Sequence, residues 1–100
     1  MIKHALFVRL EARPGKEEEV ARFLQAGLGM VQQEGATPVW FALQLGPCTF
    51  GIFDAFADED ARRAHLDGQL AHALALRAPE LLSQAPSVER IDVLGTKLPN

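Results

Sequence analysis

His65 is the residue of this chain best suited to acid–base chemistry. It follows an apolar run at residues 50–56 and an acidic cluster at residues 58–60, within a short helical pattern. An imidazole titrates near neutral pH, so it can act as a general base or donate a hydrogen bond to a substrate oxygen. The structural alternative is a ring held by a backbone carbonyl where the helix meets the sheet. The sequence leaves both roles open.

The neighbours of His65 predict a cleft beside it. On a regular helix, Ala61, His65, Gly68 and His72 share one face. Ala61 and Gly68 are small and leave room beside the imidazole. The pattern therefore predicts a cleft between this helix and the sheet, with His65 as the catalytic residue and His72 as a further contact for a ligand.

Aromatic residues on the strands are candidates for the walls of that cleft. Trp40 is the only tryptophan, and its flat ring could pack against an aromatic substrate. A buried indole N–H usually needs a partner. A place in the core or in a dimer interface is the favoured alternative. Phe7 and Phe53 are the other candidate walls.

Arg9 and Asp54 are charged residues inside otherwise apolar strands. Burying an unpaired charge is costly, so each is expected to have a partner or to lie near an edge. A cross-strand ion pair is the favoured arrangement. The alternative is that these charges orient a phenol or quinone oxygen.

Other kinds of functional site are not indicated. His4, His65 and His72 do not form a short-spaced ligand set and Cys48 stands alone, so no metal site is predicted. The sequence has no phosphate-binding loop, dinucleotide-binding glycine motif or nucleophile elbow. We expect a protein that needs no cofactor.

Length, charge and cysteine content restrict the class of protein. The 100 residues suit a single domain over residues 1–100, and a net charge of −3 without a basic cluster argues against nucleic-acid binding. No apolar run approaches the roughly 18 residues of a membrane span. One cysteine allows no intrachain disulfide, and no signal peptide is visible. These features predict a cytoplasmic protein.

The periodicities predict the element order βαββαβ. Strands are expected at residues 2–12, 38–45, 49–56 and 88–95. One helix is expected from the 13–19 segment to Gly35, and a second helical region runs from Asp58, its N-cap, to about Leu82 with a break near residues 67–68. This order is that of the ferredoxin-like α+β fold, an antiparallel sheet with both helical regions on one face.

The strands at residues 38–45 and 49–56 are apolar on both faces. Helices can cover only one face, and an open apolar face would exceed what a monomer usually exposes. The pattern therefore predicts a homodimer, in which two sheets pack face to face and eight strands enclose a shared core.

Three segments together resemble the antibiotic biosynthesis monooxygenase superfamily of dimeric α+β barrels. They are FVRLEARPGKEEEVARFL, FGIFDAFADEDARRAHL and PELLSQAPSVERIDVLGTKLP, and they span nearly the whole chain. The superfamily includes cofactor-independent oxygenases of aromatic polyketides, quinol oxygenases, haem-degrading enzymes and a sugar-phosphate isomerase.

The resemblance implies a small cofactor-independent monooxygenase that acts on an aromatic or quinol-type substrate. Two alternatives stay open: a binding or accessory protein that holds a small aromatic ligand without turnover, and an acid–base isomerase of a small metabolite. The haem-degrading activity is not carried over. This chain has Val8, His65 and Ala75 where those enzymes have asparagine, tryptophan and the iron-ligating histidine.

Overall fold

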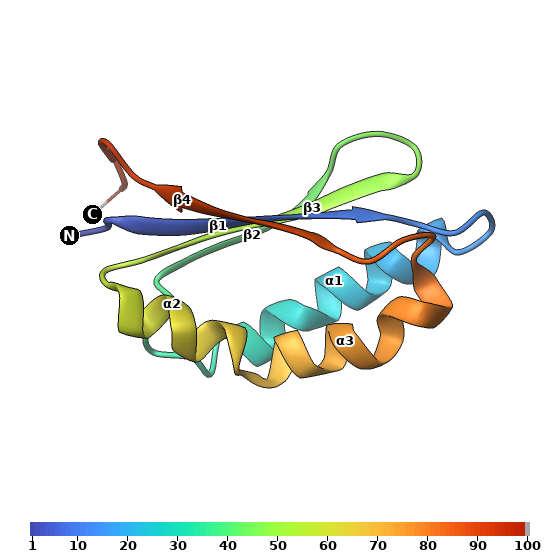
Figure 1. Ribbon diagram of the computed structural model, residues 1–100, viewed down its shortest axis with the longest axis horizontal. Coiled ribbons are helices and arrows are strands. Elements are labelled where there is room, and N and C mark those ends of the chain that lie inside the picture. Colours follow the sequence, from blue (N-terminus) through green and yellow to red (C-terminus); the bar gives the residue numbers. More distant parts are fainter. Residues whose placement is uncertain (100) are drawn as a thin grey trace.

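A four-stranded antiparallel sheet with three helices on one face makes up the computed structural model, which describes residues 1–99 (Figure 1). In chain order the elements are β1 (His4–Glu11), α1 (Glu17–Val31), β2 (Val39–Gln44), β3 (Thr49–Phe56), α2 (Glu59–Leu66), α3 (Gln69–Leu81) and β4 (Ser87–Asp92). The strand order β2-β3-β1-β4 confirms the ferredoxin-like α+β fold. None of the helices within residues 1–99 is long and apolar enough to cross a membrane.

Tight turns set both ends of α1. Before it, Gly15 has φ of +85° and the Lys16 amide donates to the Arg13 carbonyl at 2.9 Å, a turn that favours glycine at its third position. α1 ends at Val31, earlier than Gly35, the end predicted from the sequence. The reason is local: the Glu34 amide donates to the Val31 carbonyl at 2.8 Å, a three-residue spacing that tightens the last turn.

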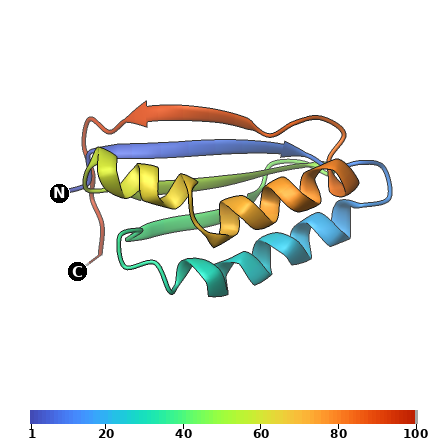
Figure 2. The same cartoon turned by 60° about the horizontal axis from the view of Figure 1, so that its bottom comes forward.

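The second helical region is two helices, as the sequence predicted. The Asp58 carboxylate accepts a hydrogen bond from the Ala61 amide at 2.8 Å and caps α2. The chain leaves the helix at Asp67, and α3 begins after Gly68, whose backbone is extended. Figure 2 shows α1 and α3 side by side beneath the sheet, with α2 preceding α3.

The two faces of the sheet carry different apolar layers. Even-numbered residues of β1 and their partners on β3 face the helices and form the core with residues of α1 and the end of α3: Val8, Leu10, Val20, Leu24, Phe50, Ile52, Leu81 and Leu82. The opposite face, called here the outer face, has Phe7, Phe53 and Phe41 in register across three strands.

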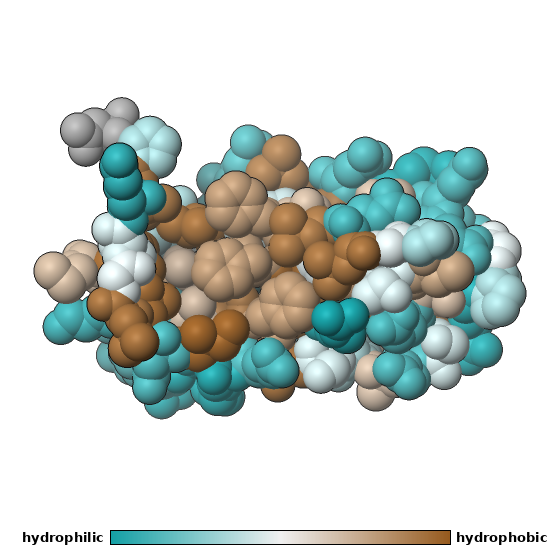
Figure 3. All heavy atoms as spheres, turned by 90° about the horizontal axis from the view of Figure 1, so that it is seen from above, coloured by the Kyte–Doolittle hydropathy of each residue, from teal (hydrophilic) through white to brown (hydrophobic). Residues whose placement is uncertain are grey.

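The outer face is open in the single chain. Phe41 is 53% exposed, and its ring stacks on Phe53 with centroids 6.5 Å apart. Figure 3 looks onto this face and shows an apolar area with aromatic rings at its centre. The prediction that β2 and β3 are apolar on both faces is confirmed. β4 is shorter than predicted and ends at Asp92.

Candidate functional site

An apolar cleft of about 270 Å³ lies between the sheet and the helices α2 and α3. Leucine, isoleucine, valine, alanine and proline side chains form its walls, and among the residues that line it only Asp54 and His65 carry polar side chains. Asp54 comes from the middle of β3, and His65 from the last turn of α2. The cleft therefore combines an apolar body with one polar end, the usual composition of a small-molecule site.

The His65 ring lies between two carboxylates from different parts of the chain. Nδ1 is 2.7 Å from Oε1 of Glu34, which follows α1, and Nε2 is 2.9 Å from Oδ2 of Asp54. The structural role considered from the sequence, a ring bonded to a backbone carbonyl, is not the arrangement found. An acceptor at each nitrogen favours the imidazolium, because only the charged ring has two N–H donors.

The electrostatics of the site favour the charged ring on balance. Burial lowers the pKa of His65, but the two neighbouring carboxylates, Asp54 and Glu34, outweigh burial and raise that pKa above its ordinary value. Phe56 packs beside the ring, with centroids 5.4 Å apart. The imidazole is thus held in place by two acids and one aromatic contact.

Asp54 keeps acceptor capacity for a ligand. It is 1% exposed, yet neither of its oxygens has a hydrogen-bond partner among residues 1–99. Its contact with His65 Nε2 has the distance of an ion pair but not the alignment of a hydrogen bond. A buried acceptor without a donor is rare in folded proteins. A hydroxyl or amine of a ligand in the cleft could supply that donor.

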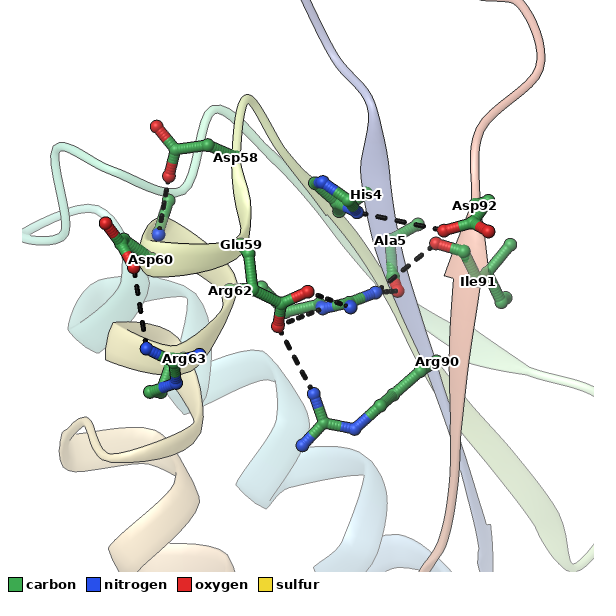
Figure 4. Close-up of polar contacts among 11 residues, drawn as sticks. His4, Ala5, Asp58, Glu59, Asp60, Arg62, Arg63, Arg90, Ile91 and Asp92 are labelled. Carbon is green, nitrogen blue, oxygen red and sulfur yellow. Dashed lines mark hydrogen bonds and ion pairs between the residues drawn. The ribbon is translucent and has the colours of Figure 1, made fainter.

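Arg62 fixes α2 against the sheet (Figure 4). The same helix carries His65. The guanidinium is buried, and Nη1 donates to the backbone carbonyls of Ala5 in β1 at 3.2 Å and Ile91 in β4 at 3.4 Å. Glu59, one turn earlier, holds the other side of the guanidinium, with Oε1 3.3 Å from Nε. Sequence reasoning did not find this anchor, because a buried arginine and an exposed one look alike in a helical pattern.

Trp40 lies in the core, as favoured from the sequence. It is on the helix side of β2, is the register partner of Asp54, and packs against the core cluster. Its ring does not line the cleft. The indole Nε1 is buried without a hydrogen-bond partner in the described chain. Its neighbour Gly27 on α1 has no side chain, which lets α1 approach this ring closely.

Phe7, Phe53 and Arg9 do not reach the cleft, and this corrects their expected place near His65. Successive side chains of a strand point to opposite faces, and these three share the outer face. Arg9 lies over the Phe7 ring and 4.0 Å from Glu11 of its own strand. The expected cross-strand ion pair is wrong. Arg9 lies near Glu11 of its own strand, and Asp54 of β3 pairs with His65 of α2.

His72 is also separated from His65. Asp67 and Gly68 separate the two helices, so the face that a continuous helix would share is broken there. His72 is exposed in the first turn of α3 and does not line the cleft. In contrast, Val8, His65 and Ala75, the three positions compared with haem-degrading enzymes, all line it.

Glu34 is the residue of the site that sequence reasoning missed. Besides His65, it contacts Thr37, whose hydroxyl donates to Oε1 at 2.9 Å. Nothing in the local pattern marks it, because it is a single acidic residue in the loop between α1 and β2. Its contact with His65 spans 31 positions and depends on how α1 ends.

Known structures share this fold across the chain. NE2512, a protein of unknown function from Nitrosomonas europaea, matches with a TM-score of 0.98 and 54% identity over 100% of this chain and 97% of that one. A candidate antibiotic biosynthesis monooxygenase from Caulobacter crescentus CB15 matches with a TM-score of 0.80 and 16% identity over 94% and 92% of the two chains.

A second candidate antibiotic biosynthesis monooxygenase, from Nitrosomonas europaea, matches with a TM-score of 0.81 and 13% identity over 92% of this chain and 90% of that one. At such identities the likeness concerns the fold. No protein-family model matches the chain, and no curated protein sequence does. The chain therefore belongs to the same family as NE2512 of Nitrosomonas europaea, and its fold is that of the antibiotic biosynthesis monooxygenases.

Proposed function

We propose that this protein is a small oxygenase that needs no metal or flavin and acts on a phenol or hydroquinone bound in the cleft. The observation that carries the proposal is the apolar cleft whose polar end is a buried acid–imidazole pair, Asp54 and His65. A volume of about 270 Å³ is just below the range of about 300–1,000 Å³ for drug-sized ligands, so a ligand with one or two rings fits.

The two residues would work as one acid–base unit. The hydroxyl of the substrate donates its proton to an open oxygen of Asp54, while His65 balances the charge on that carboxylate. The resulting anion is electron-rich enough to reduce dioxygen. For a hydroquinone, one oxygen atom enters the ring and the other leaves as water, so that hydroquinone and dioxygen give a hydroxyquinone and water. The apolar walls would orient the ring and exclude solvent.

Charge favours this class of substrate over a phosphorylated one. No lysine or arginine of residues 1–99 lines the cleft, and its polar end presents acceptor oxygens. An anionic group would be repelled there, which argues against the acid–base isomerase of a phosphorylated metabolite. A binding or accessory protein would use the same cleft without turnover, and only an activity measurement separates it from an enzyme.

The test is oxygen uptake with a set of benzohydroquinones and naphthohydroquinones. We expect uptake by the native protein and a loss of about 100-fold or more in Asp54→Asn, because general acid–base catalysis contributes about 10²–10⁴-fold. Asp60→Asn, at a highly exposed position of α2, is the matched control. Binding of a hydroquinone without uptake would make the protein a binding module. If the protein neither binds a hydroquinone nor takes up oxygen, the proposal is overturned.

We also propose that a second copy of the chain covers the outer face. The face carries Phe7, Phe41 and Phe53 in one row and the exposed Leu45 beside them. A self-complementary apolar sheet face suits a two-fold interface. Each protomer would keep its own cleft, because the cleft lies on the opposite side of the sheet.

A further inference from the structure

We propose that Glu34 is a positioning residue that keeps Asp54 an open proton acceptor, although Glu34 itself does not line the cleft. The inference deepens the proposed function and rests on it for the role of Asp54. The arrangement is a chain of three side chains, in which one carboxylate holds the ring that neutralises the other.

The three side chains run from solvent to the buried cleft. The exposed fraction falls from 20% for the side chain of Glu34 to 7% for His65 and 1% for Asp54. On the outer side, Glu34, Thr37 and Gly68 line an open hollow of about 540 Å³, and His65 lines both this hollow and the cleft. The imidazole is therefore the wall between the two spaces.

Burial makes Asp54 dependent on its neighbours. A carboxylate in apolar surroundings stays ionised only when a counter-charge or hydrogen bonds stabilise it. His65 supplies the counter-charge at 2.9 Å, but it must carry two protons to do so. Glu34 accepts from Nδ1 at 2.7 Å and so stabilises the doubly protonated ring.

Without Glu34, burial would favour the neutral form of the His65 ring. The proton would pass from His65 to Asp54, which would then face the cleft as a hydroxyl donor. A donor there would no longer accept the proton of a phenol. Glu34 thus determines, from outside the cleft, whether Asp54 can accept a proton from a ligand.

Other charged groups near the ring are directed elsewhere. On α2, Arg62 and Glu59 turn toward β1 and β4, and Arg63 pairs with Asp60 on the surface. Within residues 1–99, Asp54 and Glu34 are the charged side chains within 4.0 Å of the ring nitrogens. A change at Glu34 should therefore reach Asp54 through His65.

The first test follows the His65 ring by NMR during a pH titration. His65→Gln identifies its resonance among the three histidines. In Glu34→Gln we expect the ring to bind its proton about tenfold or more weakly than in the native protein. Glu34→Asp keeps the charge on a shorter side chain, so in this variant the ring should bind its proton with intermediate strength. Glu18→Gln, at an exposed position of α1, should leave the titration unchanged.

The second test measures binding of 4-nitrophenol, whose absorption band reports its ionisation. Glu34→Gln should weaken binding about tenfold in the native background and leave it unchanged in Asp54→Asn, because the effect acts through Asp54. A merely structural role of Glu34 would weaken binding equally in both backgrounds and would overturn the inference.

The two tests separate the two proposals. If the native protein does not bind 4-nitrophenol, the proposed function loses support, and the NMR titration still decides whether Glu34 controls the ring. A folded Glu34→Gln variant with an unchanged His65 titration would overturn the inference. If that variant does not fold, the Glu34→Asp titration decides in its place.

Discussion

Arg62 of α2 donates a hydrogen bond to the backbone carbonyl of Ala5 in β1 at 3.2 Å, across 57 positions of sequence. The contact joins the helix that carries His65 to the strand next to the one that carries Asp54. The distance between the two members of the proposed acid–base pair therefore depends on an arginine whose hydrogen bonds and ion pair go to other residues.

Replacement of Arg62 by alanine should destabilise the protein strongly. It removes the hydrogen bonds that the guanidinium donates to the carbonyls of Ala5 and Ile91, and a hydrogen bond to a charged group contributes about 1.5–3 kcal/mol. Arg63→Ala, at an exposed position, should change the free energy of unfolding by less than about 0.5 kcal/mol. Urea unfolding at fixed protein concentration measures both. Equal values for the two variants would contradict the anchoring role.

Stability should fall as the pH rises through the titration of His65. Its pKa is higher in the folded chain than in the unfolded one, where it is about 6.5, so the folded state binds more protons between the two values. The contribution is fully present below the unfolded pKa and lost as the pH passes the folded pKa. Urea unfolding from pH 6 to 9 should show this slope in the native protein and in His72→Gln, and a flatter slope in His65→Gln. The same slope in the native protein and in both variants would contradict this prediction.

Two glycines of α1 should respond in opposite directions to a side chain. A Cβ at Gly27 would lie 3.0 Å from a methyl group of Leu70, whereas a Cβ at Gly29 meets nothing within 4 Å. Gly27→Val should destabilise by about 1–3 kcal/mol through overpacking. Gly29→Ala should stabilise by about 0.5–1 kcal/mol, because alanine favours the helix. Thermal unfolding compares them, and a stabilised Gly27→Val would show that α1 does not pack as closely as described.

The outer face should mediate dimerisation. We expect light scattering at micromolar concentration to give about twice the chain mass of 10.9 kDa. Phe41→Glu places a charge in the middle of the aromatic row and should give a folded monomer. Leu76→Glu, at an even more exposed position on the helix layer, should remain dimeric. A native protein that is folded and monomeric under these conditions would contradict the proposal.

The sequence by itself determined the elements and their order, because the signals for these are local. The alternation of β3, the Asp58 cap and the break at Gly68 depend on residues a few positions apart, and the structure places all three as expected. The apolar character of both sheet faces followed from the same periodicity.

Only the tertiary structure decided which residues share the cleft. Alternation separates Phe7 and Phe53 from Asp54, but it does not say which set the helices will cover. That choice follows from how the helices pack over the whole sheet, and it places the expected aromatic walls on the outer face. Glu34 reaches His65 because the end of α1 tightens at Val31, and Arg62 is buried because α2 docks across two strands. These contacts join residues 29 to 57 positions apart, where local sequence patterns carry no information.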